Sequence, residues 1–281
     1  MNNFLISGFS DEISDHLGEQ IAGIKKLGME YVEMRSVEGQ FSTYFTNSQA
    51  KEIRKQLDDA GIKVSSLASR IGKYRIRDAF APHLEEFRHA LEVAHLLNTK
   101  YIRVFSFFID EGDNPDDFTD EVLRRLEIFK EEAKGSGITL LHENEKLIYG
   151  NVPQRCKVIA EELFSPEFGL VFDPSNFIEC NAEAYPYAFE MLVDYVKYVH
   201  IKDCRKADKI VVPSGMGDGC IKEILKGLKE HNYSGFLSLE PHLADYAGLA
   251  YDVNGTPKAT IKEFVLAHQA LVDILETMEE A

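Results

Sequence analysis

Four ionisable residues close short apolar segments in the second half of this 281-residue chain. They are Glu143, Asp173, His200 and Glu240, and each follows a run of strand-forming residues. Two glutamates, one aspartate and one histidine offer hard oxygen and nitrogen donors, which suit a divalent cation. We therefore predict that these four residues are the ligands of one metal ion.

The spacing of apolar residues before each ionisable residue supports a shared position. Successive side chains of a strand point to opposite faces, so residues of equal parity lie on one side. Counting back from the ionisable residues, one side is aliphatic or aromatic throughout: Ile138, Leu140, Leu170, Phe172, Val199, Leu237 and Leu239. An acid after a strand is often only a helix N-cap. Four ionisable residues at strand ends with consistent parity favour one shared site, since buried acids are normally paired with a cation or bound to a metal.

This donor set predicts a particular chemistry. Carboxylates with imidazole suit Mn²⁺, Mg²⁺, Co²⁺ or Zn²⁺, and the lack of thiolates argues against a structural zinc site. Four protein ligands leave positions for adjacent carbonyl and hydroxyl oxygens of a substrate, whose enediolate the ion would stabilise. Glu143 and Glu240 would act as an acid–base pair on opposite sides of the substrate. The predicted reaction is aldose–ketose isomerisation or C3 epimerisation.

The elements that must position these residues alternate between strand-like and helix-like segments, at roughly 35 residues per unit. Four further strands are expected over residues 4–8, 31–35, 63–69 and 101–106. Helices are expected over 12–27, 48–60, 82–97, 119–134, 153–163, 184–196, 221–230 and 257–279, the last with Thr256 as N-cap and Pro257 at its first position. Eight such units predict an α/β fold, a (β/α)8 TIM barrel forming a single domain over residues 1–281, with its chemistry at the carboxyl ends of the strands. An open doubly wound sheet is the alternative, but its glycine-rich dinucleotide turn is missing.

The composition narrows the class of partner. The chain has 31 basic and 47 acidic residues, a formal net charge of -16, so it would repel nucleic acid, and a small-molecule substrate is expected. Cys156, Cys180, Cys204 and Cys220 lack the CxxC spacing of zinc ribbons and redox pairs. The apolar run near the N-terminus is too short for a signal peptide, and no run approaches a membrane span. We expect a cytoplasmic protein with reduced thiols; a homo-oligomer is compatible with the sequence.

Four motifs carry a resemblance to a known family: His142-Glu143-Asn144, Phe172-Asp173-Pro174-Ser175-Asn176, Val199-His200-Ile201-Lys202-Asp203 and Leu237-Ser238-Leu239-Glu240-Pro241-His242. Together they resemble the sugar phosphate isomerase/epimerase group of xylose isomerase-like TIM barrels, over nearly the whole chain. The resemblance implies a Glu-Asp-His-Glu metal site, often filled by Mn²⁺ or Mg²⁺, with the two glutamates as acid–base pair. It also implies a polyhydroxy carbonyl substrate. Asn176 stands where many members keep a substrate-binding histidine.

Other polar residues near these motifs are candidates for substrate binding. Lys202 shares the parity of His200, and His242 follows Glu240 by two residues. The remaining candidates are Asp203 and Arg205, for hydroxyls or a carboxylate, and Arg70 and Lys73, for steering an anionic substrate. A surface ion pair explains Asp203 and Arg205 equally well, whereas a solvated loop is the favoured explanation for Arg70 and Lys73.

Three further features could belong to the site or to the scaffold. Glu33 and Arg35 are expected to pair with each other at the barrel mouth. His142 and Asn144 could support Glu143, although His142 could equally hydrogen-bond the helix layer. The segment Gly215-Met216-Gly217-Asp218-Gly219 could present N–H groups to a phosphate. Asp218 would repel that phosphate, so a structural turn is favoured.

Rival functions remain open to different degrees. A hydrolase resembling endonuclease IV needs extra histidines from strands three and four, and residues 64–70 and 101–106 contain none. A metal-dependent lyase or dehydratase acting on a polyol or keto-sugar shares the same proton-abstraction chemistry and is not separated by sequence. A non-catalytic barrel is a further alternative, disfavoured by the two intact glutamates.

Overall fold

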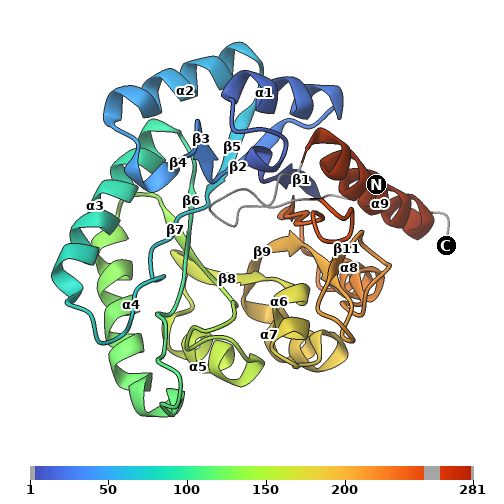
Figure 1. Cartoon of the computed structure of the whole chain (residues 1–281). Helices are drawn as coiled ribbons and strands as arrows, with labels where there is room; N and C mark the ends of the chain where they lie inside the picture. Colours follow the sequence, from blue (N-terminus) through green and yellow to red (C-terminus); the bar gives the residue numbers. More distant parts are fainter. Residues whose placement is uncertain (1–3, 250–259, 280–281) are drawn as a thin grey trace.

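The described residues of the computed structural model, 4–249 and 260–279, form one sheet of eight parallel strands that curves into a nearly closed barrel (Figure 1). The strands follow the spatial order β1-β12-β9-β8-β7-β6-β5-β2. Their bounds are β1 (Leu5–Gly8), β2 (Tyr31–Met34), β5 (Lys63–Leu67), β6 (Tyr101–Val104), β7 (Thr139–Glu143), β8 (Phe168–Phe172), β9 (Val196–Ile201) and β12 (Phe236–Leu239).

Pairing of the first and last strands closes most of the ring. Leu5 of β1 lies opposite Phe236 of β12, and the two strands stay in parallel register to Gly8 and Leu239. At the other side of β1, a parallel bridge between Phe9 and Glu33 links the chain to β2. The predicted single-domain (β/α)8 barrel is therefore confirmed.

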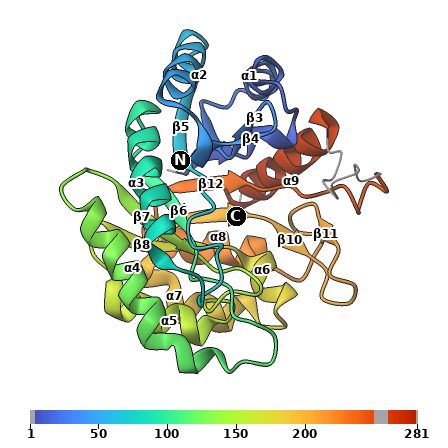
Figure 2. The same cartoon turned by 60° about the vertical axis from the view of Figure 1, so that its left-hand side comes forward.

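Helices surround this barrel on its outside, as Figures 1 and 2 show from two directions. They are α1 (Leu17–Lys26), α2 (Asn47–Asp59), α3 (Phe80–Leu96), α4 (Thr119–Ala133), α5 (Pro153–Leu163), α6 (Pro174–Glu179), α7 (Phe189–Leu192), α8 (Ile221–Glu230) and α9 (Ile261–Glu279). Two short hairpins follow β2 and β9, namely β3–β4 (Ser36–Val37 and Gln40–Phe41) and β10–β11 (Asp203–Cys204 and Val211–Val212). No helix within the described ranges is both long and apolar enough to cross a membrane.

The last helix seals the barrel beside the first strand. A Cβ added to Gly8 would lie 2.7 Å from the ring of Phe264 in α9, so this close approach requires glycine. The helix begins at Ile261, later than the expected residue 257. Thr256 and Pro257, which were expected to begin it, lie outside the described residues.

Two helix predictions were wrong in detail. The expected helix over residues 184–196 is broken, because Tyr185 is extended (φ -140°, ψ 137°) before Pro186 and only α7 is regular. The residue before a proline is disfavoured from the helical region, which explains this break. The first helix begins at Leu17 instead of residue 12, and Glu12 ends a short 3₁₀ turn with a buried side chain.

The strands bury two different faces. Their outward residues, such as Leu140, Leu170, Phe172, Val199 and Leu237, pack in the large core between barrel and helices. Inside the barrel a smaller set, the inner plug, consists of Leu141, Val171, Tyr198, Tyr101 and Phe236. This division confirms the parity predicted from the sequence, which turns the four ionisable residues inward.

Candidate metal and catalytic site

The four predicted ligands converge at the carboxyl ends of neighbouring strands. Glu143 ends β7, Asp173 is the N-cap of α6 directly after β8, His200 lies in β9, and Glu240 follows β12. All four side chains are buried, and one donor atom from each lies within 4.8 Å of the others. We call these four residues the ligand cluster.

The chemistry and spacing of this cluster fit a divalent cation. Donors at about 2.0–2.4 Å from one ion can be at most roughly 4–4.8 Å apart, which agrees with the observed spread. Oδ2 of Asp173 and Oε2 of Glu143 are buried and accept no well-directed hydrogen bond from the described residues, although each lies beside a cation, Lys202 and Arg103 respectively. Glu143, Asp173, His200 and Glu240 could therefore hold a metal ion, whose identity the donor set does not determine.

His200 is oriented by a carboxylate on its far side. Its Nδ1 lies 3.0 Å from Oε1 of Glu143 and 3.6 Å from Oε2 of Glu240. Its Nε2 faces Glu33 of β2, 3.3 Å from Oε2. A carboxylate partner of this kind fixes the ring orientation and tautomer of a ligating histidine. The predicted pair between Glu33 and Arg35 was wrong, because Glu33 points into the barrel toward His200.

Two buried cations balance the carboxylates. Nζ of Lys202 lies 2.8 Å from both Oδ2 of Asp173 and Oε2 of Glu240. Nη1 of Arg103, on β6, lies 3.2 Å from Oε2 of Glu143. Arg103 was not among the predicted site residues, although a charged residue between Ile102 and Val104, on the inward side of the strand, was the available signal.

This balance sets the protonation of the two glutamates. Burial favours the neutral form of Glu143, but His200 and Arg103 outweigh it and lower its pKa to about 2. Burial also opposes ionisation of Glu240, yet Lys202 and its other positive neighbours hold that pKa well below its usual range. Burial raises the pKa of Asp173 to about 7, since Lys202 offsets it only in part. Glu143 and Glu240 are thus ionised at neutral pH and able to accept a proton.

Two asparagines hold the ends of β7 and β8 together. The side chain of Asn144 accepts from the backbone N–H of Asp173 at 3.0 Å and donates to its carbonyl at 2.8 Å. The amide of Asn176 donates to Oε1 of Glu143 at 3.2 Å and to the carbonyl of Asn144 at 2.8 Å. Asn176 therefore contacts a member of the ligand cluster, Glu143. Its contact with substrate stays a prediction.

His142 serves neither of the roles considered for it. Its side chain is turned away from the cluster and is buried, and neither ring nitrogen has a hydrogen-bond partner among the described residues. Burial lowers its pKa to about 3, which keeps the ring neutral. A Cβ at Gly150 would lie 2.5 Å from its Cε1, so the ring fills space against that glycine.

A second polar group lies beside Glu240 at the barrel mouth. Nε2 of His242 is 3.2 Å from Oε1 of Glu12 and 3.7 Å from Oε1 of Glu240. Arg35 contacts both Glu12 and Asp11, with its Nε 2.8 Å from Oδ2 of Asp11. Burial raises the pKa of Glu12 to about 7. His242, a candidate for substrate binding, thus lies next to the cluster. Glu12, which was expected to begin a helix, lies there with it.

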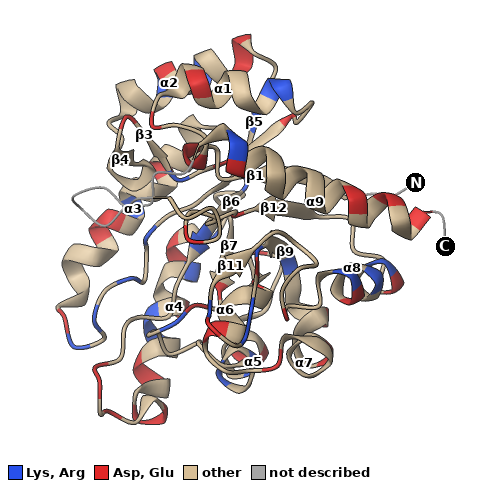
Figure 3. Cartoon of the chain, turned by 45° about the vertical axis from the view of Figure 1, so that its right-hand side comes forward, with Lys and Arg blue, Asp and Glu red and all other residues tan. Residues whose placement is uncertain are grey.

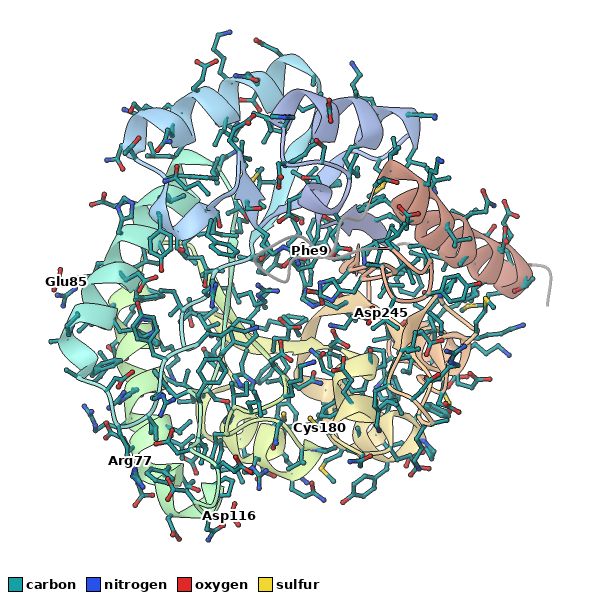
Figure 4. The ribbon with its side chains drawn as sticks, viewed as in Figure 1. Phe9, Arg77, Glu85, Asp116, Cys180 and Asp245 are labelled. Atoms are coloured by element: carbon teal, nitrogen blue, oxygen red, sulfur yellow. The ribbon has the colours of Figure 1, made fainter. Side chains whose placement is uncertain are left out.

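The ring of Phe9 packs against the ligand cluster on the side of β1. The ring of Phe9 meets that of His200 edge-on at 5.2 Å, and the guanidinium groups of Arg35 and Arg103 lie over it at 4.8 and 5.3 Å. In Figure 4 Phe9 lies near the centre of the ring of strands, whereas Glu85 and Asp116 lie at its periphery.

The predicted residue Asp203 has another set of partners. Its Oδ2 accepts the N–H groups of Gly215 and Gly217 at 2.9 and 3.0 Å, and its Oδ1 accepts that of Gly219 at 2.8 Å. We call residues 215–219 the glycine loop. The N–H groups of this loop thus bind a buried carboxylate of the same chain, which agrees with the structural turn favoured from the sequence.

We expect Asp203→Asn to lower the free energy of unfolding by about 2–3 kcal/mol, because charge-assisted hydrogen bonds to the glycine loop are lost and buried N–H groups are left without acceptors. Urea unfolding followed by circular dichroism measures this change. The matched control is Asp208→Asn, whose exposed carboxylate pairs with Arg205 and should matter by less than about 1 kcal/mol. Equal stability of the two variants would contradict the assignment.

The other substrate candidates are engaged outside the cluster. Arg205 forms an exposed ion pair with Asp208 at 2.7 Å. Arg70 is exposed and lies over the ring of Phe41 at 4.9 Å. Lys73 pairs with Glu145 at 2.9 Å. Of the substrate candidates, the structure therefore brings Asn176, Lys202 and His242 to the cluster. Arg205, Arg70 and Lys73 lie outside it.

Comparison with known proteins agrees with this fold. A D-tagatose 3-epimerase-like protein matches with a TM-score of 0.76 at 18% identity, covering 99% of each chain. An IOLI protein with a binding zinc atom matches with a TM-score of 0.79 at 17% identity, over 98% of this chain and 99% of the other. The probable 3-DHS dehydratase AsbF from Bacillus anthracis matches with a TM-score of 0.69 at 16% identity, over 94% of this chain and 99% of the other.

At these identities the structural similarity shows the shared fold alone. No curated protein matches the sequence. A family model described as xylose isomerase-like TIM barrel matches residues 21–263, most of the chain. The protein therefore belongs to the xylose isomerase-like TIM barrel family.

Proposed function

We propose that the protein is a divalent-metal-dependent isomerase or epimerase of a polyhydroxy carbonyl compound. The observation that carries this proposal is the buried convergence of Glu143, Asp173, His200 and Glu240 within 4.8 Å at the catalytic end of the barrel. Similarity in fold to a D-tagatose 3-epimerase-like protein and to a zinc-bearing protein supports it.

An ionised glutamate provides the base that this reaction needs. In our proposal Glu143 and Glu240 face the substrate from two sides: one ionised carboxylate removes the proton from the carbon beside the carbonyl, and the other, once it has taken up a proton from solvent, returns that proton. Return to the opposite face of the same carbon gives an epimer, and return to the neighbouring carbon gives an isomer. A metal ion held by the ligand cluster would neutralise the negative charge that builds on the substrate's oxygens.

The contacts of the cations favour an unphosphorylated substrate. The N–H groups of the glycine loop, which follow the seventh barrel strand where many barrels bind phosphate, already bind Asp203. Arg35 and Lys73 are neutralised by Asp11 and Glu145. We therefore propose a neutral sugar, with His242 and Asn176 as partners for its hydroxyl groups.

A dehydratase is the second candidate, because Lys202 provides a buried proton donor at the cluster. After a glutamate removes the proton beside the carbonyl, a neighbouring hydroxyl would leave with a proton from Nζ of Lys202 as water. Similarity in fold to a probable dehydratase is consistent with this alternative.

Solvent-deuterium exchange tests both candidates. The protein is incubated in D₂O with Mn²⁺ and a panel of neutral ketoses, including D-tagatose and D-fructose, and the sugars are recovered for NMR. We expect deuterium on the carbon beside the carbonyl in at least one sugar, with no exchange after treatment with EDTA. An epimer or isomer supports the first candidate, and loss of water supports the second. No exchange with any sugar at full metal occupancy would reject both.

A further inference from the structure

A cavity lies at the opposite end of the barrel from the ligand cluster. It has a volume of about 310 Å³ and lies among the amino ends of β2, β5, β6 and β12. Three rings, Tyr31, Tyr101 and Phe236, and three cations, Arg54, Lys63 and Lys100, line it. We call it the amino-end cavity. Barrel enzymes place their chemistry at the other end, so an occupant here would be separate from the proposed reaction.

Aromatic rings form one continuous surface of this cavity. Tyr31 and Phe236 meet edge-on with their ring centres 4.9 Å apart, and Tyr101 meets Phe236 edge-on at 6.3 Å. Each of the three side chains is only half-buried, although Phe236 and Tyr101 also belong to the inner plug. Edge-to-face contact with a further ring is therefore available at this surface.

The rim of the cavity carries positive charge that the described residues leave unneutralised. Lys63 and Lys100 are exposed, and neither forms an ion pair within residues 4–249 and 260–279. The ammonium of Lys63 lies 5.6 Å from the centre of the Tyr31 ring, beside the aromatic surface. Arg54 differs, because its Nε pairs with Asp58 at 2.6 Å.

This local charge contrasts with that of the whole chain, which carries 47 acidic and 31 basic residues. On helices α1, α2 and α8 acidic and basic positions are interspersed (Figure 3). A cavity that combines two free ammonium groups with an aromatic surface selects a ligand with both a ring and a negative charge.

We propose that the amino-end cavity binds a small aromatic carboxylate. Its ring lies against Tyr31 and Phe236, and its carboxylate lies between the ammonium groups of Lys63 and Lys100. The volume of about 310 Å³ is at the lower end of the roughly 300–1,000 Å³ of small-ligand pockets, which suits one substituted ring and excludes a dinucleotide. An inorganic anion would use the lysines but leave the aromatic surface in water.

Binding of 4-fluorobenzoate to the full-length protein, followed by ¹⁹F NMR, tests this proposal. We expect saturable line broadening, and an affinity that falls about 5–10-fold in the Lys63→Gln/Lys100→Gln variant, because surface charge contacts contribute modestly. The neutral analogue 4-fluorobenzyl alcohol should bind at least about 5-fold more weakly than the acid. Lys226→Gln, which removes one exposed positive charge from α8, should bind the acid as the unaltered protein does.

A second substitution tests the aromatic surface. Tyr31→Leu should weaken 4-fluorobenzoate several-fold, and an equal concentration of inorganic phosphate should displace little of it. Absence of saturable binding, unchanged affinity in the double lysine variant, or equal affinity for the acid and the alcohol would overturn the proposal. Full displacement by equimolar phosphate would overturn the assignment of an aromatic ligand. Circular dichroism of each variant verifies that its fold is intact.

Discussion

Replacing either Glu143 or Glu240 by glutamine is expected to slow solvent-deuterium exchange into the substrate by about 10²–10⁴-fold, the range by which positioned acid–base groups accelerate proton transfer. Both carboxylates are ionised, because the positive charges of His200, Arg103 and Lys202 outweigh their burial. A glutamine has nearly the same shape and keeps one ligand oxygen, but it cannot accept the proton. Exchange into a ketose in D₂O, measured by NMR, gives the rate.

Loss of metal must be separated from loss of the base in this experiment. Each variant is therefore assayed at saturating Mn²⁺, with its metal content determined by elemental analysis. Glu162→Gln on the exposed face of α5 removes the same charge far from the cluster and should exchange at the unaltered rate. Undiminished exchange in both Glu143→Gln and Glu240→Gln would reject their roles as acid and base.

Substituting His200 by asparagine should weaken metal binding by at least about 100-fold. The change removes the nitrogen donor, whose Nδ1 lies within 3.9 Å of all three cluster carboxylates, and it leaves Glu33 without its imidazole partner. Asparagine is chosen because its amide lies at the position of Nδ1, beside the three cluster carboxylates, whereas alanine would leave those buried charges without a polar neighbour there. Metal affinity is measured by titration of the metal-free protein with Zn²⁺.

Substitution of Glu33, the carboxylate beside Nε2 of His200, should weaken metal binding to a smaller degree. Glu33→Gln keeps the ligand but weakens its orientation, so a loss of about 10–100-fold is expected. His95→Asn, an exposed histidine on α3, should have no effect. The predicted order of affinity is thus the unaltered protein and His95→Asn, then Glu33→Gln, then His200→Asn. Unchanged affinity in His200→Asn would exclude the histidine as a ligand.

The sequence was sufficient to place the ligand cluster because strand periodicity is a local property. The alternation before Glu143 and Glu240 separates Leu140 and Leu237, which pack against helices, from Leu141 and Phe236, which fill the barrel. Once the fold is a closed ring of parallel strands, equal parity at the strand ends is enough to make side chains converge. The barrel and its four inward residues could therefore be predicted together.

The supporting charges could not be assigned in the same way. Glu33 and Arg103 have the correct parity, but their partners His200 and Glu143 are more than a hundred and about forty residues away in sequence. Glu12 was placed in a helix because its neighbours fit a helical pattern, and its contact with His242 joins opposite ends of the chain. The pairs of Glu33 and Glu12 depend on closure of the ring, and the pair of Arg103 depends on the register between β6 and β7. A single sequence carries no local signal for either.

The role of Asp203 could not be predicted from the sequence, for a different reason. Its neighbour Lys202 and the nearby Arg205 suggested a polar rim around a substrate, and the glycine loop was expected to be a structural turn, with a phosphate site as the alternative. Neither pattern reveals that the carboxylate of Asp203 accepts three hydrogen bonds from backbone N–H groups of the glycine loop. The break at Pro186, in contrast, was visible in the sequence, because proline disfavours helix in the residue before it.

The inner plug affects the path by which a small molecule could reach the ligand cluster. Leu141, Val171 and Tyr198 are buried inside the barrel between its two ends. Under the proposed function, a substrate would therefore reach the carboxylates from the carboxyl ends of the strands, and its product would leave by the same end. An occupant of the amino-end cavity would not obstruct that path.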